Sequence, residues 1–159
     1  MTIEPRILEL DTIPVLGILR SVNHAATDFQ ALWDRDFMVY HDQIRKQSID
    51  GAYYGVSFRV EIDNADVVEY LAGMAVREPS IIPEGLVARY VPAGLYALFE
   101  FDFKDMNNTI GYALESWLPA SPYERNHSVS ITDFLIFGRG QVAFHLPVRE
   151  AHTAQPDRN

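Results

Sequence analysis

Asp133 is the residue of this chain whose chemistry depends most on what surrounds it. It lies in the stretch SVSITDFLIF, which alternates as a strand does, and it shares one strand face with Val129, Ile131, Leu135 and Phe137. If that face points inward, a carboxylate lies among apolar groups and needs a cationic partner. A bound cation would be such a partner. The alternative is a surface aspartate bonded to nearby backbone.

Aromatic side chains would complete a site for a cation. Tyr54 and Tyr70 lie on the apolar faces of two strands predicted to be adjacent, and Trp117 ends the apolar stripe of a predicted helix. The face of an aromatic ring attracts a cation by about 0.5 to 2 kcal/mol. Core packing is the alternative for each ring, because aromatic residues dominate protein cores. The predicted site comprises seven residues: Tyr54, Phe58, Tyr70, Tyr96, Trp117, Asp133 and Phe134.

Other kinds of chemistry find little support in the sequence. The chain has no cysteine, which removes disulfides, thiolate catalysis and zinc–cysteine sites. Its five histidines lack the spacing of metal ligands, so we predict neither a metal nor a cofactor. With 13 Lys+Arg against 22 Asp+Glu, the net charge of −9 disfavours direct nucleic-acid binding. Such acidity suits a cationic partner, or serves solubility alone.

Hydrophobic periodicity predicts the strands and helices that carry these residues. Residues 6–19 are predicted as one extended segment with a bulge or bend at Pro14 and Gly17. A helix is predicted over TDFQALWDRDFMVYHDQI (27–44), with a capping box from Thr27 to Gln30. Two strands, AYYGVSFRV (52–60) and VVEYLAGMAV (67–76), flank the polar turn EIDNAD and form a predicted hairpin.

The same order of elements recurs after the linker REPSIIPEG. An extended segment over 86–103 precedes a second helix that ends at Pro119, and two strands follow around Gly138-Arg139-Gly140. Pro92 follows Pro14 by 78 residues, and adding 78 to YYGVSF (53–58) gives ITDFLI (131–136), the strand with the same place in the second half. The pattern strand, helix, strand, strand therefore occurs twice.

This repeat predicts an α+β fold of two pseudo-symmetric βαββ (SHS2-like) units that form an antiparallel sheet with two main helices and a central cleft. The cleft is the expected ligand site. We predict one domain over residues 1–150, with repeats at about 5–77 and 86–148 and a flexible tail at 151–159. The N-terminal stretch lacks the features of a signal peptide and no segment reaches membrane-spanning length, so we expect a cytoplasmic protein without membrane contact.

Several stretches, in this order, carry a family resemblance: YYGVSF, YLAGMAV, PEGLVARYVPAGLYALF, ESWLPASPYE and VAFHLPV. The chain resembles the GyrI-like small-molecule-binding domain, the effector-binding domain of AraC-type and MerR-type multidrug regulators, from about Ile7 to Val148. The resemblance implies a pocket that accepts lipophilic, cationic small molecules through stacked aromatic rings and a buried carboxylate. Family members often carry Phe-Glu-x-aromatic in the region that reads SITDFLIF here, so counting without a gap gives Thr132 for the glutamate and a one-residue shift gives Asp133.

Three functions follow from this resemblance besides drug binding in a free-standing sensor domain. One is a protein-binding inhibitor of DNA gyrase, as for some relatives, which would depend on the acidic surface. Another is hydrolysis of strained rings in toxic compounds, which in relatives uses a pocket tryptophan and glutamate. The last is a sensor subunit for a separate DNA-binding protein, because the first strand is predicted so near the start that no DNA-binding module precedes it. We favour non-catalytic binding.

Overall fold

The computed structural model describes residues 3–24, 26–60, 67–78 and 81–151. Its first half contains β1 (Arg6–Leu10), β2 (Ile13–Asn23), a helical segment, β3 (Ser48–Arg59) and β4 (Val67–Val76). Its second half contains β5 (Val87–Val91), β6 (Gly94–Asp102), a helical segment, β7 (Tyr123–Arg125), β8 (Ile131–Gly138) and β9 (Gln141–Glu150). The predicted order of strand, helix, strand, strand is therefore present twice.

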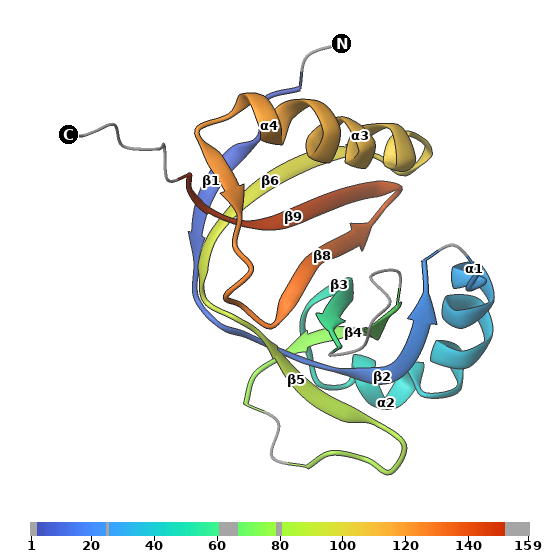
Figure 1. The fold of residues 1–159 in the computed structure, drawn as a ribbon. Helices are drawn as coiled ribbons and strands as arrows, with labels where there is room; N and C mark the ends of the chain where they lie inside the picture. The colour runs from blue at the N-terminus through green and yellow to red at the C-terminus, as the bar shows by residue number, and fades with distance from the viewer. Residues whose placement is uncertain (1–2, 25, 61–66, 79–80, 152–159) are drawn as a thin grey trace.

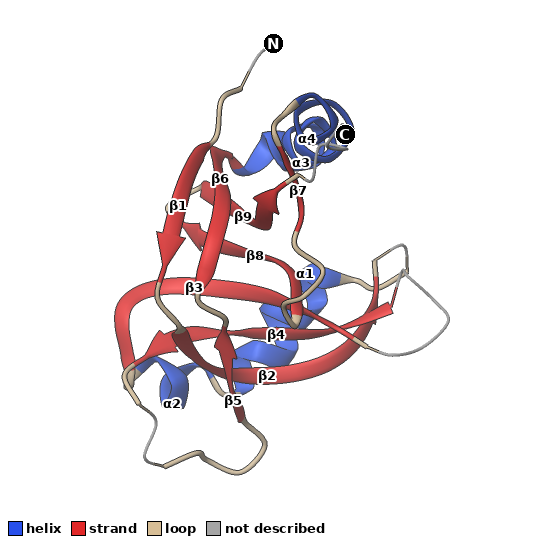
Figure 2. Ribbon diagram, turned by 60° about the vertical axis from the view of Figure 1, so that its left-hand side comes forward, coloured by secondary structure: helices blue, strands red, loops and turns tan. Residues whose placement is uncertain are grey.

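All strands belong to one curled antiparallel sheet (Figures 1 and 2). Its order is β1-β6-β9-β8-β3-β4-β2-β5, with β7 paired to β9. Reading this order from either end gives corresponding strands of the two halves, with β3 and β8 side by side at the centre. The predicted α+β fold of two pseudo-symmetric βαββ units is confirmed.

The predicted single bent strand over residues 6–19 is in fact two strands that pair in different halves of the sheet. β1 pairs with β6, whereas β2 pairs with β4 and β5. The break lies at residues 11–12, and Pro14 is inside β2, opposite Tyr90 of β5. Residues 92–93 make the corresponding break between β5 and β6. The repeated proline construction thus marks where the chain crosses from one half of the sheet to the other.

Each helical segment combines short α, π and 3-10 turns. The first contains α1 (Phe29–Ala31), a π stretch (Leu32–Asp36), a 3-10 turn (Phe37–Val39) and α2 (His41–Arg45). The second contains a 3-10 turn (Phe103–Asp105), α3 (Met106–Tyr112), a π stretch (Ala113–Trp117) and α4 (Leu118–Ala120). Among the described residues, no helix is long and apolar enough to cross a membrane.

The ends of both helical segments differ slightly from the prediction. The N-cap of the first is Asp28, whose carboxylate accepts from the Ala31 amide, and Thr27 Oγ1 instead accepts from the Asn23 amide. The second continues one residue past Pro119 because proline is tolerated in the first turn of α4. The predicted turn EIDNAD (61–66) and residues 152–159 of the predicted tail lie outside the described residues.

Three apolar clusters hold the fold together. The first helical segment packs on β2 and β4 around Phe37 and Ile44, and the second packs on β6 and β9 around Phe99 and Phe144. The third cluster lies on the opposite face of β3 and β8, where residues of β2, β5 and β6 cover the central strands. The helical segments thus cover the two ends of one sheet face and leave its centre between them (Figure 1).

Candidate ligand-binding site

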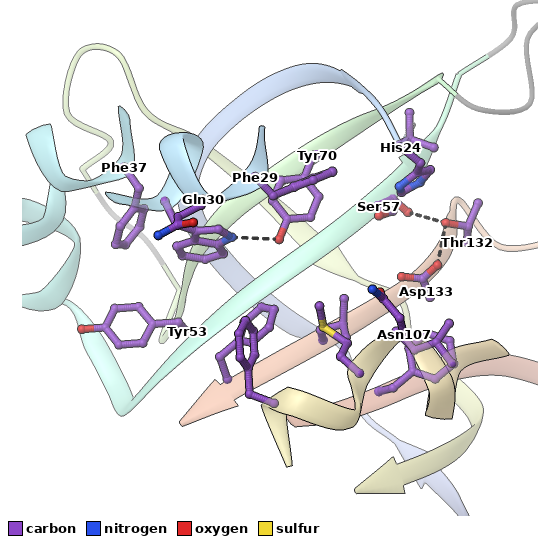
Figure 3. Close-up of a pocket in the computed structure, with 18 of the residues that line it drawn as sticks. His24, Phe29, Gln30, Phe37, Tyr53, Ser57, Tyr70, Asn107, Thr132 and Asp133 are labelled. Carbon is purple, nitrogen blue, oxygen red and sulfur yellow. Dashed lines mark hydrogen bonds between the residues drawn. The ribbon is translucent and has the colours of Figure 1, made fainter. Parts of the chain in front are cut away.

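A cavity of about 1400 Å³ lies over the central strands, between the two helical segments, and is partly open to solvent. Both halves of the chain contribute to its walls, as the predicted central cleft requires. This volume exceeds the roughly 300–1,000 Å³ usual for small-molecule pockets. Figure 3 shows aromatic side chains, including Phe37 and Tyr53, toward one end and His24, Thr132 and Asp133 toward the other.

Trp33 organises the aromatic end of the cavity. Its ring centroid lies 4.9 Å from that of Phe37, 5.8 Å from that of Phe137 and 6.2 Å from that of Tyr53. The indole Nε1 donates a hydrogen bond of 3.1 Å to Tyr70 Oη (Figure 3). Trp33 and Phe37 come from the first helical segment, Tyr53 and Tyr70 from β3 and β4, and Phe137 from β8. Rings from both halves therefore form one wall.

Thr132 and Asp133 form the polar end because β8 contains a bulge. Ser57 pairs with Asp133 and Phe58 pairs with Ile131, which leaves Thr132 without a partner in the ladder. Both Thr132 and Asp133 consequently line the cavity. Thr132 Oγ1 lies 3.2 Å from Asp133 Oδ2 and 3.4 Å from the Ser57 carbonyl oxygen. The bulge thus brings to the site both residues that the sequence left as alternatives.

Asp133 is a carboxylate without a counter-ion in its immediate surroundings. Burial raises the pKa of this carboxyl, although the Thr132 hydroxyl and then the charges of Arg125, His24 and Arg59 act in the opposite direction. Asp133 retains some exposure because its side chain faces the open cavity. The ion pairs among the described residues are Arg6–Glu100, Arg35–Asp36, Arg89–Glu69 and Arg149–Glu124, and none includes Asp133.

Arg59 lies at the same end, but other groups occupy its guanidinium. It donates to the carbonyls of Val129, Asn126 and Ile131 at 3.1–3.2 Å and lies 3.3 Å from His127 Nδ1. These contacts tie the segment before β8 to the end of β3. Arg59 therefore supports the wall of the cavity and does not neutralise the carboxylate.

Two of the seven predicted site residues, Tyr70 and Asp133, line the cavity. The Tyr70 ring also makes an edge contact with Phe29, at 5.1 Å between centroids. Burial raises the pKa of the Tyr70 phenol, which therefore stays neutral near pH 7. Leu135 and Phe137 share the face of Asp133 as predicted. The prediction was wrong for Val129 and Ile131, which pack in the cluster on the opposite face, because the bulge at Thr132 lies between them and Asp133.

Four predicted site residues, Tyr54, Phe58, Tyr96 and Phe134, lie on the opposite face of the sheet, within the third apolar cluster. Phe134 contacts Tyr54 and Tyr96 at centroid distances of 6.2 and 5.4 Å. The Tyr96 hydroxyl donates to the Pro92 carbonyl at 2.6 Å, and burial raises the pKa of this phenol to about 12. The structure gives these four residues a packing role away from the cavity.

Trp117 also lies outside the cavity. It lies in the second helical segment and packs against the cluster on β6 and β9, with its ring centroid 5.3 Å from that of Phe99 and 6.2 Å from that of Tyr123. From this segment, Met106 and Ile110 of α3 and Leu114 of the π stretch line the cavity instead. The cavity tryptophan is instead Trp33, in the first half of the chain.

The cavity is also lined by Trp33, Tyr53 and Phe137, which were not among the predicted site residues. The alternation in β3 separates Tyr54 and Phe58 from Tyr53 as predicted, but the cavity lies on the less apolar face, that of Tyr53. The face of Tyr54 and Phe58 is buried against the other strands, and the mixed face of Tyr53 and Ser57 lines the cavity. An open site needs polar groups among its rings, so the mixed face was the signal. Within the described residues, no cluster of three or more His, Asp or Glu side chains fits a metal ion.

The integron-associated effector binding protein family, Cass2, matches residues 6–146. The chain belongs to this family. The Cass2 description is that of a binding protein and not of an enzyme. No curated protein matches the chain.

Solved structures share the Cass2 fold at low sequence identity. The integron cassette protein VCH_CASS2, from the mobile metagenome of Vibrio cholerae, has 18% identity and a TM-score of 0.67 over 92% of this chain and 96% of that one. SAV2435 bound to tetraphenylphosphonium has 12% identity and a TM-score of 0.74 over 92% and 94% of the two chains. The EcmrR C-terminal domain has 11% identity and a TM-score of 0.69 over 95% and 100%. These likenesses support the effector-binding fold.

Proposed function

We propose that this protein binds bulky lipophilic cations in the cavity between its two helical segments, with Asp133 as the counter-charge. The observation that carries the proposal is a carboxylate on the wall of an aromatic cavity with no ion-pair partner among the described residues. A buried charge without a partner is costly. A cationic ligand would offset that cost, whereas a neutral ligand of the same shape would not.

The aromatic end suits the apolar body of such a ligand. Trp33, Tyr53, Phe37 and Phe137 offer ring faces and edges, and each ring that faces the cation adds about 0.5 to 2 kcal/mol. Ring contacts impose few directional requirements, so ligands of different outline can bind. The complex of SAV2435 with tetraphenylphosphonium supports this class of ligand, because that protein has the same fold.

We further propose that binding is a sensing event without chemistry, passed to a separate DNA-binding protein. EcmrR, which has a domain of this fold, is known in a complex with DNA, and the match covers 58% of that longer chain. The net charge of −9 argues against direct contact of this chain with a nucleic-acid backbone. Gyrase inhibition through the acidic surface is the second candidate, favoured by the same net charge, and would leave the cavity without a role.

Tryptophan fluorescence tests the cation proposal. In a Trp117→Phe background, Trp33 is the remaining tryptophan and reports on the cavity alone. We expect tetraphenylphosphonium to quench its emission saturably and tetraphenylborate, an anion of the same shape, to leave it unchanged. Asp133→Asn should weaken binding of the cation about tenfold or more, whereas the exposed control Asp42→Asn should leave the affinity unchanged. Equal binding of both ions, or an unaffected Asp133→Asn variant, would contradict the proposal.

A further inference from the structure

Arg125 is a second unsatisfied charge at the polar end of the cavity. It is the last residue of β7, where its backbone pairs with Val148 of β9, and its half-buried side chain lines the cavity. Among the described residues, its guanidinium makes no hydrogen bond and no ion pair within 4.0 Å. Arg125 thus differs from Arg59, whose guanidinium donates to three backbone carbonyls.

Arg125 precedes Asn126, whose carbonyl accepts a hydrogen bond from the Arg59 guanidinium, and the same guanidinium donates to the carbonyl of Ile131, two residues before Asp133. The side chains of Arg125 and Asp133 make no ion pair with each other. The charge of Arg125 acts on both the Asp133 carboxylate and the Arg59 guanidinium. The wall of the cavity therefore includes one carboxylate and one guanidinium that are separated by more than ion-pair distance. A single cation on a ligand would neutralise Asp133 but add a third positive charge near Arg125 and Arg59.

We propose that this end of the cavity recognises an amphoteric head group: a cationic group that pairs with Asp133 and a carboxylate that pairs with Arg125, both carried on an apolar aromatic body. This inference rests on the proposed function and narrows its ligand class from lipophilic cations to lipophilic zwitterions. A guanidinium binds a carboxylate through two parallel hydrogen bonds, so Arg125 would also orient the ligand. The aromatic end around Trp33 would hold the apolar body.

Tetramethylrhodamine and its methyl ester separate the two ligand classes. The dyes share one cationic aromatic body, but only the free acid carries a carboxylate. Fluorescence anisotropy titration should show that the wild-type protein binds the acid about tenfold more tightly than the ester, because one charge-assisted contact is gained. Arg125→Gln should remove this preference and bind the ester at least as well as the wild type does, since a repulsive charge is gone.

Two further variants keep the test independent of folding defects. Arg125→Lys retains the charge and should keep part of the preference for the acid. Arg45→Gln removes an equal charge from an exposed position on α2, outside the cavity, and should keep the full preference for the acid over the ester. A wild-type protein that binds the ester as tightly as the acid, or an Arg125→Gln variant that retains the preference, would overturn the inference.

The result also shows which of the two proposals fails. Binding of the ester and of tetraphenylphosphonium without preference for the acid would overturn the zwitterion inference and leave the cation site intact. Binding of tetraphenylphosphonium but of neither dye would overturn the inference alone. Failure of all three probes to bind would overturn both proposals.

Discussion

The hydroxyl of Tyr70 lies directly over Gly55. A Cβ at residue 55 would be 2.1 Å from Tyr70 Oη and 2.8 Å from the ring carbon that bears it. Only a residue without a side chain lets the phenol lie across β3 and reach Trp33 Nε1, 3.1 Å away. Gly55 is therefore required for the Tyr70 ring to occupy its place in the aromatic wall and to bond to Trp33.

Gly55→Ala should displace the Tyr70 ring and destabilise the protein by about 1–3 kcal/mol, the usual cost of overpacking a core. The Trp33 emission spectrum should change as well, because the hydrogen bond to Tyr70 is lost. Chemical denaturation measures the first effect and fluorescence the second. Gly138→Ala is the matched control: its Cβ would meet nothing within 4 Å. Equal stability of the two variants would contradict this account of Gly55.

Asp133→Asn should raise the melting temperature by about 2–4 °C at pH 7 while it abolishes selective cation binding. Because burial raises the pKa of Asp133, the folded protein binds this proton more tightly than the unfolded chain does. Stability is therefore lost as the pH rises from the unfolded pKa of about 3.9 through the folded pKa. Asparagine keeps the shape and removes the charge.

Calorimetric melting of the wild type and Asp133→Asn at pH 5 and pH 8 tests whether the ionised carboxylate destabilises the fold as the pH rises. The advantage of the variant should be larger at pH 8, where more of the wild-type carboxyl is ionised. A variant that is less stable than the wild type at both pH values would show that the carboxylate stabilises the fold and has no need of a ligand.

Trp33→Leu should weaken tetraphenylphosphonium binding about 10- to 30-fold, since the central ring of the aromatic wall and its contact with Tyr70 are both removed. Trp33→Phe keeps a ring face and should lose less affinity for tetraphenylphosphonium. Isothermal titration calorimetry gives these affinities without a fluorescent reporter. Trp117→Phe changes a tryptophan outside the cavity and should bind as the wild type does. A larger loss from Trp117→Phe than from Trp33→Leu would contradict the assignment.

His145 should make the fold sensitive to acid. It lies in the interior, stacked on Phe134 at 4.1 Å between ring centroids, and burial lowers its pKa to about 4. The unfolded chain, with a histidine pKa of about 6.5, binds the proton more tightly, so stability is lost as the pH falls from about 6.5 to 4. Between pH 7 and pH 5 this loss is about 2 kcal/mol.

Urea denaturation at pH 7 and pH 5 measures that loss. His145→Leu should show less acid sensitivity than the wild type, whatever its stability at pH 7. Asp133 acts with the opposite sign, because its raised pKa favours the folded state at lower pH. The comparison between wild type and variant isolates the histidine. If the free energy of unfolding of His145→Leu fell as much between pH 7 and pH 5 as that of the wild type, a buried, neutral His145 would be contradicted.

The offset of 78 residues read from the sequence corresponds to a structural axis. Val56 and Phe134 are 78 residues apart and lie directly opposite each other in the β3–β8 pair. The pseudo-twofold axis relating the two halves therefore passes between them. Repeated hydrophobic patterns and prolines could predict this fold because both halves meet the same packing requirements.

The site could not be predicted in the same way because it departs from the symmetry. Gly55 and Asp133 are 78 residues apart and therefore occupy equivalent positions in the two halves. One position has no side chain and is covered by Tyr70, whereas the other carries a carboxylate. The bulge at Thr132 is a local backbone event without a glycine to signal it. Which face of β3 meets the cavity depends on how β5 and β6 cover the sheet. Strand alternation separates the two faces, but only the mixture of polar and aromatic residues on the face of Tyr53 and Ser57 indicates which of them lines the cavity.

Anomalous diffraction from a crystal soaked with tetraphenylarsonium would locate the bound cation, because the arsenic atom marks its centre. We predict one strong anomalous peak inside the cavity, between Trp33 and Asp133, that becomes much weaker in Asp133→Asn crystals soaked in the same way. A peak outside the cavity, or a peak that persists unchanged without the carboxylate, would contradict an aromatic site with Asp133 as its counter-charge.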